Sequence, residues 1–437
     1  MKGMEKTMRT VNFGVIGGGS IFSPELVDLI TKELERLGNV NIKFMDVDQK
    51  RQSVVGGLCE RIVKKKKSVL PGTVDISYVD TYQKAIEGSD YILIQFRVGG
   101  EDARIEDELL GKKYCIPFVE TVSVCGIATF LRTYTELEKV AKLINHFAPD
   151  AWVLNFANPA GVIAESLSKL GVKNVIGVCN ASTRLLQFLK PKLGFDDNAD
   201  FFMNWRGLNH LTVVDRFVVE GKEMMSVILD GMKDYETDRI PFPAEMCRRL
   251  GFLPNQYFQY YYLEREIIKK EQAAEKVRSE MVKEINASLL NQYETIDEVP
   301  DDLTKRGGSG YSKTVMEVIL SLHTGNRKIH YIVTQNKGAI PELPYDSFVE
   351  IPCMVDKNSV MPIACEKLPD TAAPLICTMK AYEIKLIEAA MERNKNKLYN
   401  SMMIHPLLGS HDLVRPLMDE ILEKNRIYLS EELVEAK

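Results

Sequence analysis

The sequence predicts an α/β protein that has a doubly wound parallel sheet in its N-terminal part and a second, mixed α/β, helix-rich lobe after it. Three observations lead to this prediction. A short apolar strand and a glycine turn open the chain at residues 11–20, apolar runs then alternate with helical segments, and long helical segments dominate after residue 200. We expect residues 8–200 to form the first domain and residues 201–437 the second lobe.

The composition is that of an ordinary globular protein. The chain has 437 residues, of which 45% are hydrophobic, and a net charge of −5, which gives no electrostatic basis for binding nucleic acid. No apolar run approaches the roughly 18 residues that a membrane helix needs, and no apolar segment follows the charged N-terminus. The eight cysteines form no CxxC pair. We therefore expect reduced thiols, a cytoplasmic location and no membrane partner.

The stretch NFGVIGGGSIFSPELVDLI at residues 12–30 predicts a strand, a glycine turn and a helix. Residues 11–16 suit a buried strand, Ser23 can N-cap the helix, and Pro24 suits its first position. The next strand, in NIKFMDVD, ends near Asp46, whose carboxylate can accept hydrogen bonds from a ribose diol. This order favours a Rossmann-like site for NAD, in which the pyrophosphate lies at the helix N-terminus.

The glycine motif is imperfect, because its third glycine would fall at Phe22. The alternative is a plain strand–turn–helix with no ligand. The candidate cofactor-binding residues are Gly17, Gly18, Gly19, Ser20, Ile21 and Asp46.

Three further apolar runs predict buried parallel strands: YILIQF at 91–96, AWVLNF at 151–156 and VIGV at 175–178. Each is followed by a polar loop, and ligands of open α/β sheets bind at the carboxyl ends of the strands. After residue 200 the pattern predicts a strand in LTVVDRFVV and long helical segments at 260–293 and 372–395.

Several side chains in these regions could carry chemistry. Cys179 follows a predicted strand and His210 lies 31 residues later, and a thiolate with an imidazole suits a borderline divalent metal. On sequence alone, a core cysteine and a structural histidine explain the same two residues. A tyrosine in the cluster at 257–262 can act as a base or can pack in the core. The arginines at 97, 104, 278 and 306 suit phosphate, or lie on the surface.

Taken together, the chain resembles the family 4 glycoside hydrolases, which depend on NAD and a metal ion. The resemblance rests most on PDAWVLNFANPAGVIAESLSKLGVKNVIGVC, and GLNH, KRGGSGYS, NKGAIPELP and VEIPCMVDKNSVMPI agree with it. Within the family, GVCN, GLNHL and YFQYYYLERE are most similar to the 6-phospho-β-glucosidases. Asn180 stands where members that act on α-linked phosphosugars tend to have Asp.

The resemblance also implies roles for individual residues. Cys179 and His210 would hold Mn²⁺ or another divalent metal ion, Tyr257 would be the base, and Glu120 would raise the basicity of that tyrosine. The implied substrate-binding residues are Arg104, Asn158, Arg278 and Asn180. The implied partner is a phosphorylated disaccharide or aryl glycoside, and the implied assembly is a homodimer or homotetramer.

One segment departs from the family pattern. Members usually have glycine–proline–glycine three residues after the glutamate that matches Glu120, whereas this chain has Ser123-Val124-Cys125. Bulkier residues there can reshape the pocket near the nicotinamide and the sugar.

The activity that the resemblance implies is a net hydrolysis by oxidation, elimination, addition and reduction, in which NAD⁺ takes a hydride from C3 of the sugar and NADH returns it. In the scheme that the resemblance implies, Tyr257 would remove the proton at C2. The alternatives are another family 4 specificity (a 6-phospho-α-glucoside, an α-galactoside or a glycuronide), an ordinary NAD-dependent dehydrogenase, or a regulatory protein that binds a nucleotide.

Overall fold

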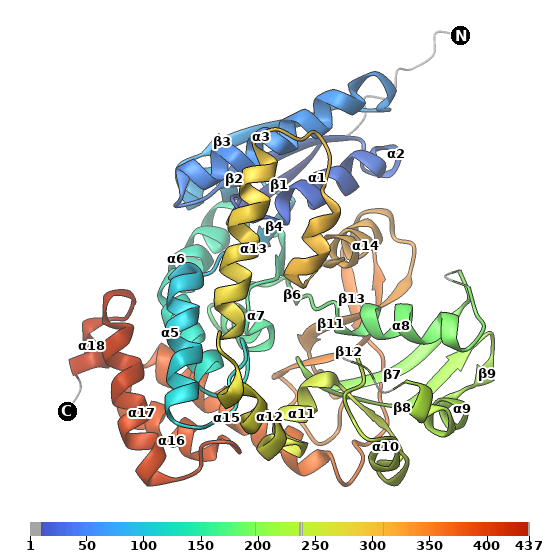
Figure 1. Cartoon of the computed structure of the whole chain (residues 1–437). Coiled ribbons are helices and arrows are strands. Elements are labelled where there is room, and N and C mark those ends of the chain that lie inside the picture. The colour runs from blue at the N-terminus through green and yellow to red at the C-terminus, as the bar shows by residue number, and fades with distance from the viewer. Residues whose placement is uncertain (1–9, 197, 236, 238, 309, 436–437) are drawn as a thin grey trace.

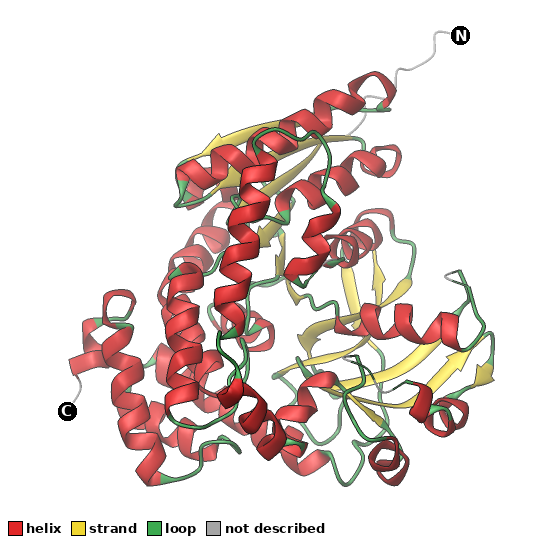
Figure 2. Cartoon of the chain, viewed as in Figure 1, coloured by secondary structure: helices red, strands yellow, loops and turns green. Residues whose placement is uncertain are grey.

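A single sheet runs through the whole molecule, and helices pack on its faces (Figures 1 and 2). The computed structural model describes residues 10–435 except 197, 236, 238 and 309. The strands are β1 (Thr10–Ile16), β2 (Asn39–Met45), β3 (Val74–Val79), β4 (Tyr91–Ile94), β5 (Trp152–Asn155), β6 (Val175–Gly177), β7 (Phe201–Leu208), β8 (Leu211–Val219), β9 (Lys222–Glu223), β10 (Leu253–Pro254), β11 (Lys328–Gln335), β12 (Phe348–Asp356) and β13 (Ser359–Pro362).

The helices differ greatly in length, from four residues to the 25 of α6. They are α1 (Ser23–Lys32), α2 (Leu34–Leu37), α3 (Gln49–Lys66), α4 (Tyr82–Ile86), α5 (Gly100–Lys113), α6 (Ser123–Phe147), α7 (Ala160–Lys169), α8 (Ala181–Lys192), α9 (Met225–Asp230), α10 (Ala244–Leu250), α11 (Gln259–Tyr262), α12 (Glu264–Ala273), α13 (Arg278–Tyr293), α14 (Tyr311–Thr324), α15 (Ala373–Met391), α16 (Lys395–Ile404), α17 (His411–Lys424) and α18 (Glu431–Glu435). Short 3₁₀ turns include η3 (Gln256–Phe258), η4 (Asp301–Arg306) and η5 (Arg426–Tyr428).

The first six strands form the predicted doubly wound parallel sheet. Their spatial order is β3-β2-β1-β4-β5-β6, and every neighbouring pair is parallel. Strands β4, β5 and β6 are buried at every position, which explains why they are continuous apolar runs in the sequence. The prediction of a Rossmann-like N-terminal sheet is confirmed.

The second lobe continues the same sheet with antiparallel strands. β11 pairs with β6, β12 with β11, and β7 with β12, so the sheet crosses from one lobe to the other without a break. Helix α13 also lies against α5 and α3 of the first lobe (Figure 1). We therefore propose that the ranges 8–200 and 201–437 are two lobes of one folded unit; residues 8, 9, 436 and 437 lie outside the described residues.

Two local expectations were wrong. The segment 260–293, which we expected to be one long helical stretch, is divided into α11, α12 and α13. Ser23 does not N-cap α1, because its hydroxyl donates to the Gly18 carbonyl at 2.9 Å, and the cap position is Phe22, which has no side-chain cap.

Among the described helices, none is long and apolar enough to cross a bilayer.

Candidate active site

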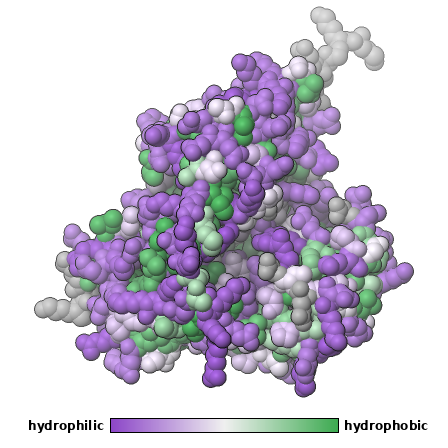
Figure 3. All heavy atoms as spheres, viewed as in Figure 1, coloured by the Kyte–Doolittle hydropathy of each residue, from purple (hydrophilic) through white to green (hydrophobic). Residues whose placement is uncertain are grey.

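A cavity of about 970 Å³ opens at the carboxyl ends of the parallel strands. The residues that follow β1, β2, β4, β5 and β6 line it, and so do residues of the second lobe that include His210, Tyr257, Arg306 and Tyr311. The face of the molecule seen in Figure 3 is largely hydrophilic, with only scattered apolar side chains. A cavity of about 970 Å³ is at the upper end of the range for small-molecule sites, so it has room for a dinucleotide beside a second ligand.

The glycine turn lies at one end of this cavity. Gly17 has φ of +93°, and a Cβ there would lie 2.7 Å from the Phe96 nitrogen, so the turn needs glycine. Asp46 accepts the Gly19 N–H at 2.8 Å, and Arg51 Nε donates to the Gly19 carbonyl at 2.7 Å. These bonds tie the turn to the end of β2, where the acidic group faces the cavity.

The candidate cofactor residues divide into two groups. Gly17, Gly19, Ser20 and Asp46 line the cavity, whereas Gly18 and Ile21 lie behind them. A Cβ on Gly18 would lie 2.7 Å from the Phe44 side chain, so this glycine lets the turn pack on β2. A glycine turn without side chains, a helix N-terminus and an acidic group together fit a dinucleotide.

Cys179 and His210 line the same cavity, although they come from different lobes. Both are buried, at 2% and 5% exposure. Burial lowers the pKa of His210 to about 4, so its imidazole is neutral at pH 7 and free to bind a metal ion. Thr121 Oγ1 lies 2.7 Å from His210 Nδ1, which leaves Nε2 for that role.

The donors around Cys179 also suit a metal ligand. Burial raises the pKa of the Cys179 thiol to about 12, and the charge of Glu350 adds to the increase. The Ala181 N–H and the side chains of Asn209 and Tyr311 donate hydrogen bonds to the sulfur, and these bonds oppose the increase. A divalent cation would favour the thiolate. The described residues contain no group of three or more His, Cys, Asp or Glu side chains able to bind a metal. The thiolate–imidazole pair therefore fits a divalent ion that takes its other ligands from water or substrate oxygens.

Tyr257 stacks on His210, with ring centroids 3.8 Å apart and planes 4° from parallel. Burial raises the pKa of Tyr257 well above its usual value, and Tyr260 and Glu120 add to the increase. The side chain is therefore a neutral phenol in the ligand-free chain. A cation held by His210 would favour the phenolate, because it lies next to the ring.

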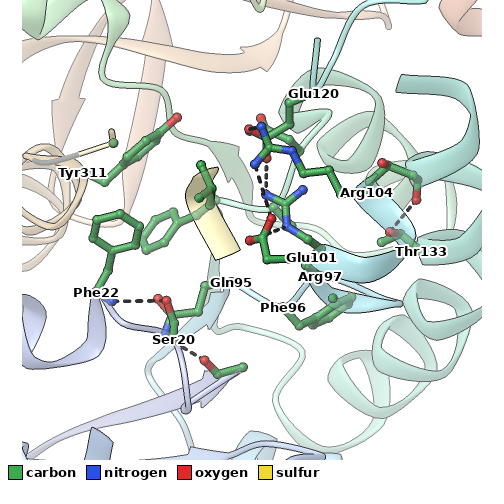
Figure 4. A pocket seen from close by; sticks show the side chains of 18 of the residues that line it. Ser20, Phe22, Gln95, Phe96, Arg97, Glu101, Arg104, Glu120, Thr133 and Tyr311 are labelled. Carbon is green, nitrogen blue, oxygen red and sulfur yellow. Dashed lines mark hydrogen bonds and ion pairs between the residues drawn. The ribbon is translucent and has the colours of Figure 1, made fainter. Parts of the chain in front are cut away.

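Glu120 lies in a group of charged side chains on one side of the cavity (Figure 4). Arg97 donates to Glu120, and the Arg104 Nη2 is 3.9 Å from the same carboxylate. Burial opposes ionisation of Glu120, but the guanidinium groups of Arg97, Arg104 and Arg306 outweigh it and hold its pKa well below the usual value. Glu120 is thus an anion, and its charge contributes to the raised pKa of Tyr257.

The candidate substrate residues also line the cavity, but their surroundings differ. Arg104 is buried and donates to Glu108 at 3.0 Å, so its charge is already balanced by a carboxylate. Arg278 is exposed, and its guanidinium donates to the Arg306 carbonyl at 3.2 Å. Asn158 follows β5, and Asn180 precedes α8.

The segment that departs from the family pattern begins helix α6. Ser123 has φ of +51°, a left-handed conformation in which glycine is the usual residue, and its hydroxyl donates to the Pro117 carbonyl. Ser123, Val124 and Cys125 are all buried. None of the three lines the cavity, so they stand behind its wall.

Four residues around the candidate metal site were not singled out in the sequence: Thr121, Asn209, Glu350 and Tyr311. Asn209, Tyr311 and Glu350 stand in the motif blocks GLNH, KRGGSGYS and VEIPCMVDKNSVMPI, which were a usable signal. The contacts of Asn209 and Tyr311 with Cys179 could not be found from spacing, because Asn209 follows β7 and Tyr311 begins α14, and only the tertiary fold brings both to Cys179.

Comparisons with known proteins agree with the resemblance. A family model described as family 4 glycosyl hydrolase matches residues 12–194, and a model of the C-terminal domain of family 4 glycosyl hydrolases matches residues 205–408. The chain is 32% identical to the 6-phospho-beta-glucosidase BglT of Thermotoga maritima, over 96% of this chain and 99% of that protein. It is 30% identical to a probable 6-phospho-beta-glucosidase of Bacillus subtilis, over 95% and 96% of the two chains.

A solved structure matches over almost the same length. It is the 6-phospho-beta glucosidase of Thermotoga maritima with manganese, NAD⁺ and glucose-6-phosphate, which has a TM-score of 0.89 and 31% identity, and covers 96% of this chain and 99% of that one.

Proposed function

The chain belongs to family 4 of the glycosyl hydrolases, and we propose that it hydrolyses 6-phospho-β-glucosides with NAD⁺ and Mn²⁺ as cofactors. The observation that supports this most is the meeting of three groups in one cavity. The glycine turn, the Cys179–His210 pair and Tyr257 come from distant parts of the sequence, yet all line the same space. If the chain were an ordinary dehydrogenase, the Cys179–His210 pair and Tyr257 would have no role.

We assign the residues as follows. Gly17, Gly19, Ser20 and Asp46, with Gly18 and Ile21 behind them, hold NAD⁺, and Cys179 and His210 hold the metal ion. Arg104, Asn158, Asn180 and Arg278 bind the substrate. When bound, the nicotinamide would supply a reversible hydride acceptor, and the divalent ion would polarise oxygens of the sugar.

Within this arrangement the protein's own groups move a proton. The Tyr257 phenolate takes the proton from C2 of the sugar once C3 is a ketone, because that ketone makes the C2 proton acidic. Glu120 supports this step through its negative charge, which the arginines hold in place. Loss of the C2 proton lets the aglycone leave from C1, water then adds, and the proton returns to C2.

The test follows the proton at C2. Hydrolysis in D₂O, with isomerisation of the product excluded, should place deuterium at C2 of the released sugar phosphate, and NADH should not accumulate. Tyr257→Phe should slow both cleavage and exchange by at least a hundredfold, because one proton transfer serves both. Tyr262→Phe is a matched control, since Tyr262 contacts the Thr371 carbonyl at 3.4 Å and does not line the cavity.

A panel of aryl glycosides tests the substrate class. The 6-phospho-β-glucoside should be turned over fastest, and a preference for the α-anomer or for a glycuronide would assign a different specificity within the family. A product without deuterium at C2 would reject the mechanism, and stoichiometric NADH would indicate a dehydrogenase.

A further inference from the structure

The Glu350 carboxylate lies behind the turn that carries His210. Glu350 is on β12 and is fully buried. Its two oxygens accept from Trp205 Nε1 at 2.8 Å and from Asn209 Nδ2 at 2.9 Å, and the carboxylate also accepts the backbone N–H of His210. All three donors belong to β7 or to the turn that follows it.

Asn209 connects this carboxylate to the second candidate ligand. Its side-chain amide donates to Glu350 and also to the sulfur of Cys179. An amide nitrogen has two hydrogens, so both bonds can form at once. Glu350 therefore contacts His210 directly and Cys179 through one intervening side chain.

The turn itself needs such support. Only Asn209 and His210 separate β7 from β8, and His210 has φ of +66°, a conformation that is unfavourable for residues other than glycine. Pairing of Glu350 with Gly207 brings β12 against β7 at this point. The carboxylate is thus fixed by the sheet and can hold the turn in its strained form.

The hydrogen-bond donors of Glu350 among the described residues are neutral N–H groups, not Lys or Arg. Burial raises the pKa of Glu350 to about 7, and these donors oppose the increase. The carboxyl group therefore acts on the turn through its hydrogen bonds rather than through a fixed charge.

We propose that Glu350 is a positioning residue for the metal site, which holds Asn209 and His210 so that the Cys179 sulfur and the His210 imidazole face one divalent ion. This inference rests on the proposed function, because it takes Cys179 and His210 as the metal ligands.

The test is the affinity of the NAD⁺-saturated protein for Mn²⁺, measured by the loss of the free-ion signal in electron paramagnetic resonance. Glu350→Gln keeps the shape but turns an N–H toward one of the donors, so one bond is lost. Removal of an outer partner of a metal ligand typically weakens metal binding by about 10- to 100-fold. We expect that loss, with NAD⁺ affinity within about twofold of the wild-type value.

A spectroscopic measurement separates positioning from general destabilisation. In the Co²⁺-loaded protein, the thiolate-to-metal absorption should weaken or shift in Glu350→Gln. Glu165→Gln is the matched control, because Glu165 is also buried and accepts a backbone N–H, that of Phe348 at 3.0 Å, but its side-chain partners are Lys380 and Lys169 and not Asn209 or His210. Its Mn²⁺ affinity and Co²⁺ spectrum should match the wild type.

A second variant keeps the outcome clear if Glu350→Gln does not fold. Asn209→Ala removes the bridge to the sulfur and should also weaken Mn²⁺ binding by tenfold or more. Wild-type Mn²⁺ affinity in a folded Glu350→Gln protein, or in Asn209→Ala, overturns the inference while leaving the proposed function intact. Failure of the wild-type protein to bind Mn²⁺ overturns the metal assignment itself, and the inference with it.

Discussion

Glu271 shows how burial near the cavity sets the charge of a single residue. It lies on α12, where its carboxylate accepts the Phe118 N–H at 3.2 Å. Burial raises the pKa of Glu271 to about 7, the charge of Glu108 adds to this, and the Phe118 N–H opposes it. The folded protein therefore binds a proton at Glu271 more tightly than the unfolded chain does, because a free glutamate has a pKa of about 4.3.

This difference predicts a change of stability with pH. A raised carboxyl pKa contributes stability that is fully present below about pH 4.3 and is lost as the pH rises through 7. Glu271→Gln should match the wild type near pH 4 but be more stable at pH 8, by about 1 kcal/mol after allowance for partial exposure. Thermal unfolding at both pH values measures this, with the exposed Glu275→Gln as control. An equal difference at both pH values would contradict the prediction.

At the scale of elements, the start of α6 is a site of backbone strain. Ser123 has φ of +51° and compensates in part through its bond to the Pro117 carbonyl. Ser123→Ala loses the bond and keeps the strain, so it should destabilise the protein by about 1 kcal/mol. Ser123→Gly loses the same bond but relieves strain of about 1 kcal/mol, so it should be close to neutral. Urea unfolding of the two variants gives the ranking, and a less stable glycine variant would refute it.

The N-terminus of α13 carries the next prediction. The Arg278 guanidinium is exposed at the cavity and bonds to a backbone carbonyl, whereas Arg97 and Arg104 are paired with carboxylates. Arg278 is thus available to the substrate phosphate, and a charge-assisted hydrogen bond contributes about 1.5–3 kcal/mol. Arg278→Ala should raise KM for a 6-phosphoglucoside by roughly ten- to a hundredfold.

The effect of Arg278→Ala can be compared between the phosphorylated and the plain glucoside. Its KM for the glucoside without phosphate should not change, because the lost contact is to the phosphate. Lys283→Ala, on the same helix but paired with Asp102 outside the cavity, should leave both values unchanged. Equal effects of Arg278→Ala on the two substrates would assign Arg278 to the sugar or to the fold.

The elements also show how far the sequence alone reaches. The strands predicted at 91–96, 151–156 and 175–178 are confirmed within two residues, because a strand buried on both faces must be an apolar run. The segment 260–293 contains no proline or glycine, so its breaks could not be predicted. The Ser279 N–H and hydroxyl bond to Glu108 of α5, and such tertiary contacts override helix propensity.

The candidate site was predictable only in part for a similar reason. The glycine turn and Asp46 belong to one local βαβ pattern, which periodicity reveals. Cys179, His210 and Tyr257 meet because β11 pairs with both β6 and β12, β7 pairs with β12, and β10 pairs with β8, and no spacing rule encodes those pairings. The family resemblance, and no local pattern, predicted that these three residues act together. The assembly as a homodimer or homotetramer stays a prediction.

At the scale of the whole molecule, the cavity belongs to both lobes. Its walls run from the glycine turn after β1 to Tyr428 near the C-terminal end, and one sheet joins the two lobes beneath it. A ligand that fills the cavity therefore contacts elements on both sides. The chain should consequently unfold as one cooperative unit, and its cofactors should stabilise that unit as a whole.

This predicts how cofactor removal changes thermal stability. A ligand at a hundred times its Kd stabilises the folded state by about 2.7 kcal/mol, so NAD⁺ and Mn²⁺ should each raise the midpoint of a single transition, and removal of either should lower it. In Asp46→Ala, NAD⁺ should lose most of its effect on the midpoint, while the effect of Mn²⁺ should remain. In Cys179→Ala, Mn²⁺ should lose its effect, while that of NAD⁺ should remain. Differential scanning calorimetry of each variant with each cofactor measures these four midpoints. Two separate transitions, of which NAD⁺ shifts only one, would instead mean that the lobes unfold independently despite their common sheet.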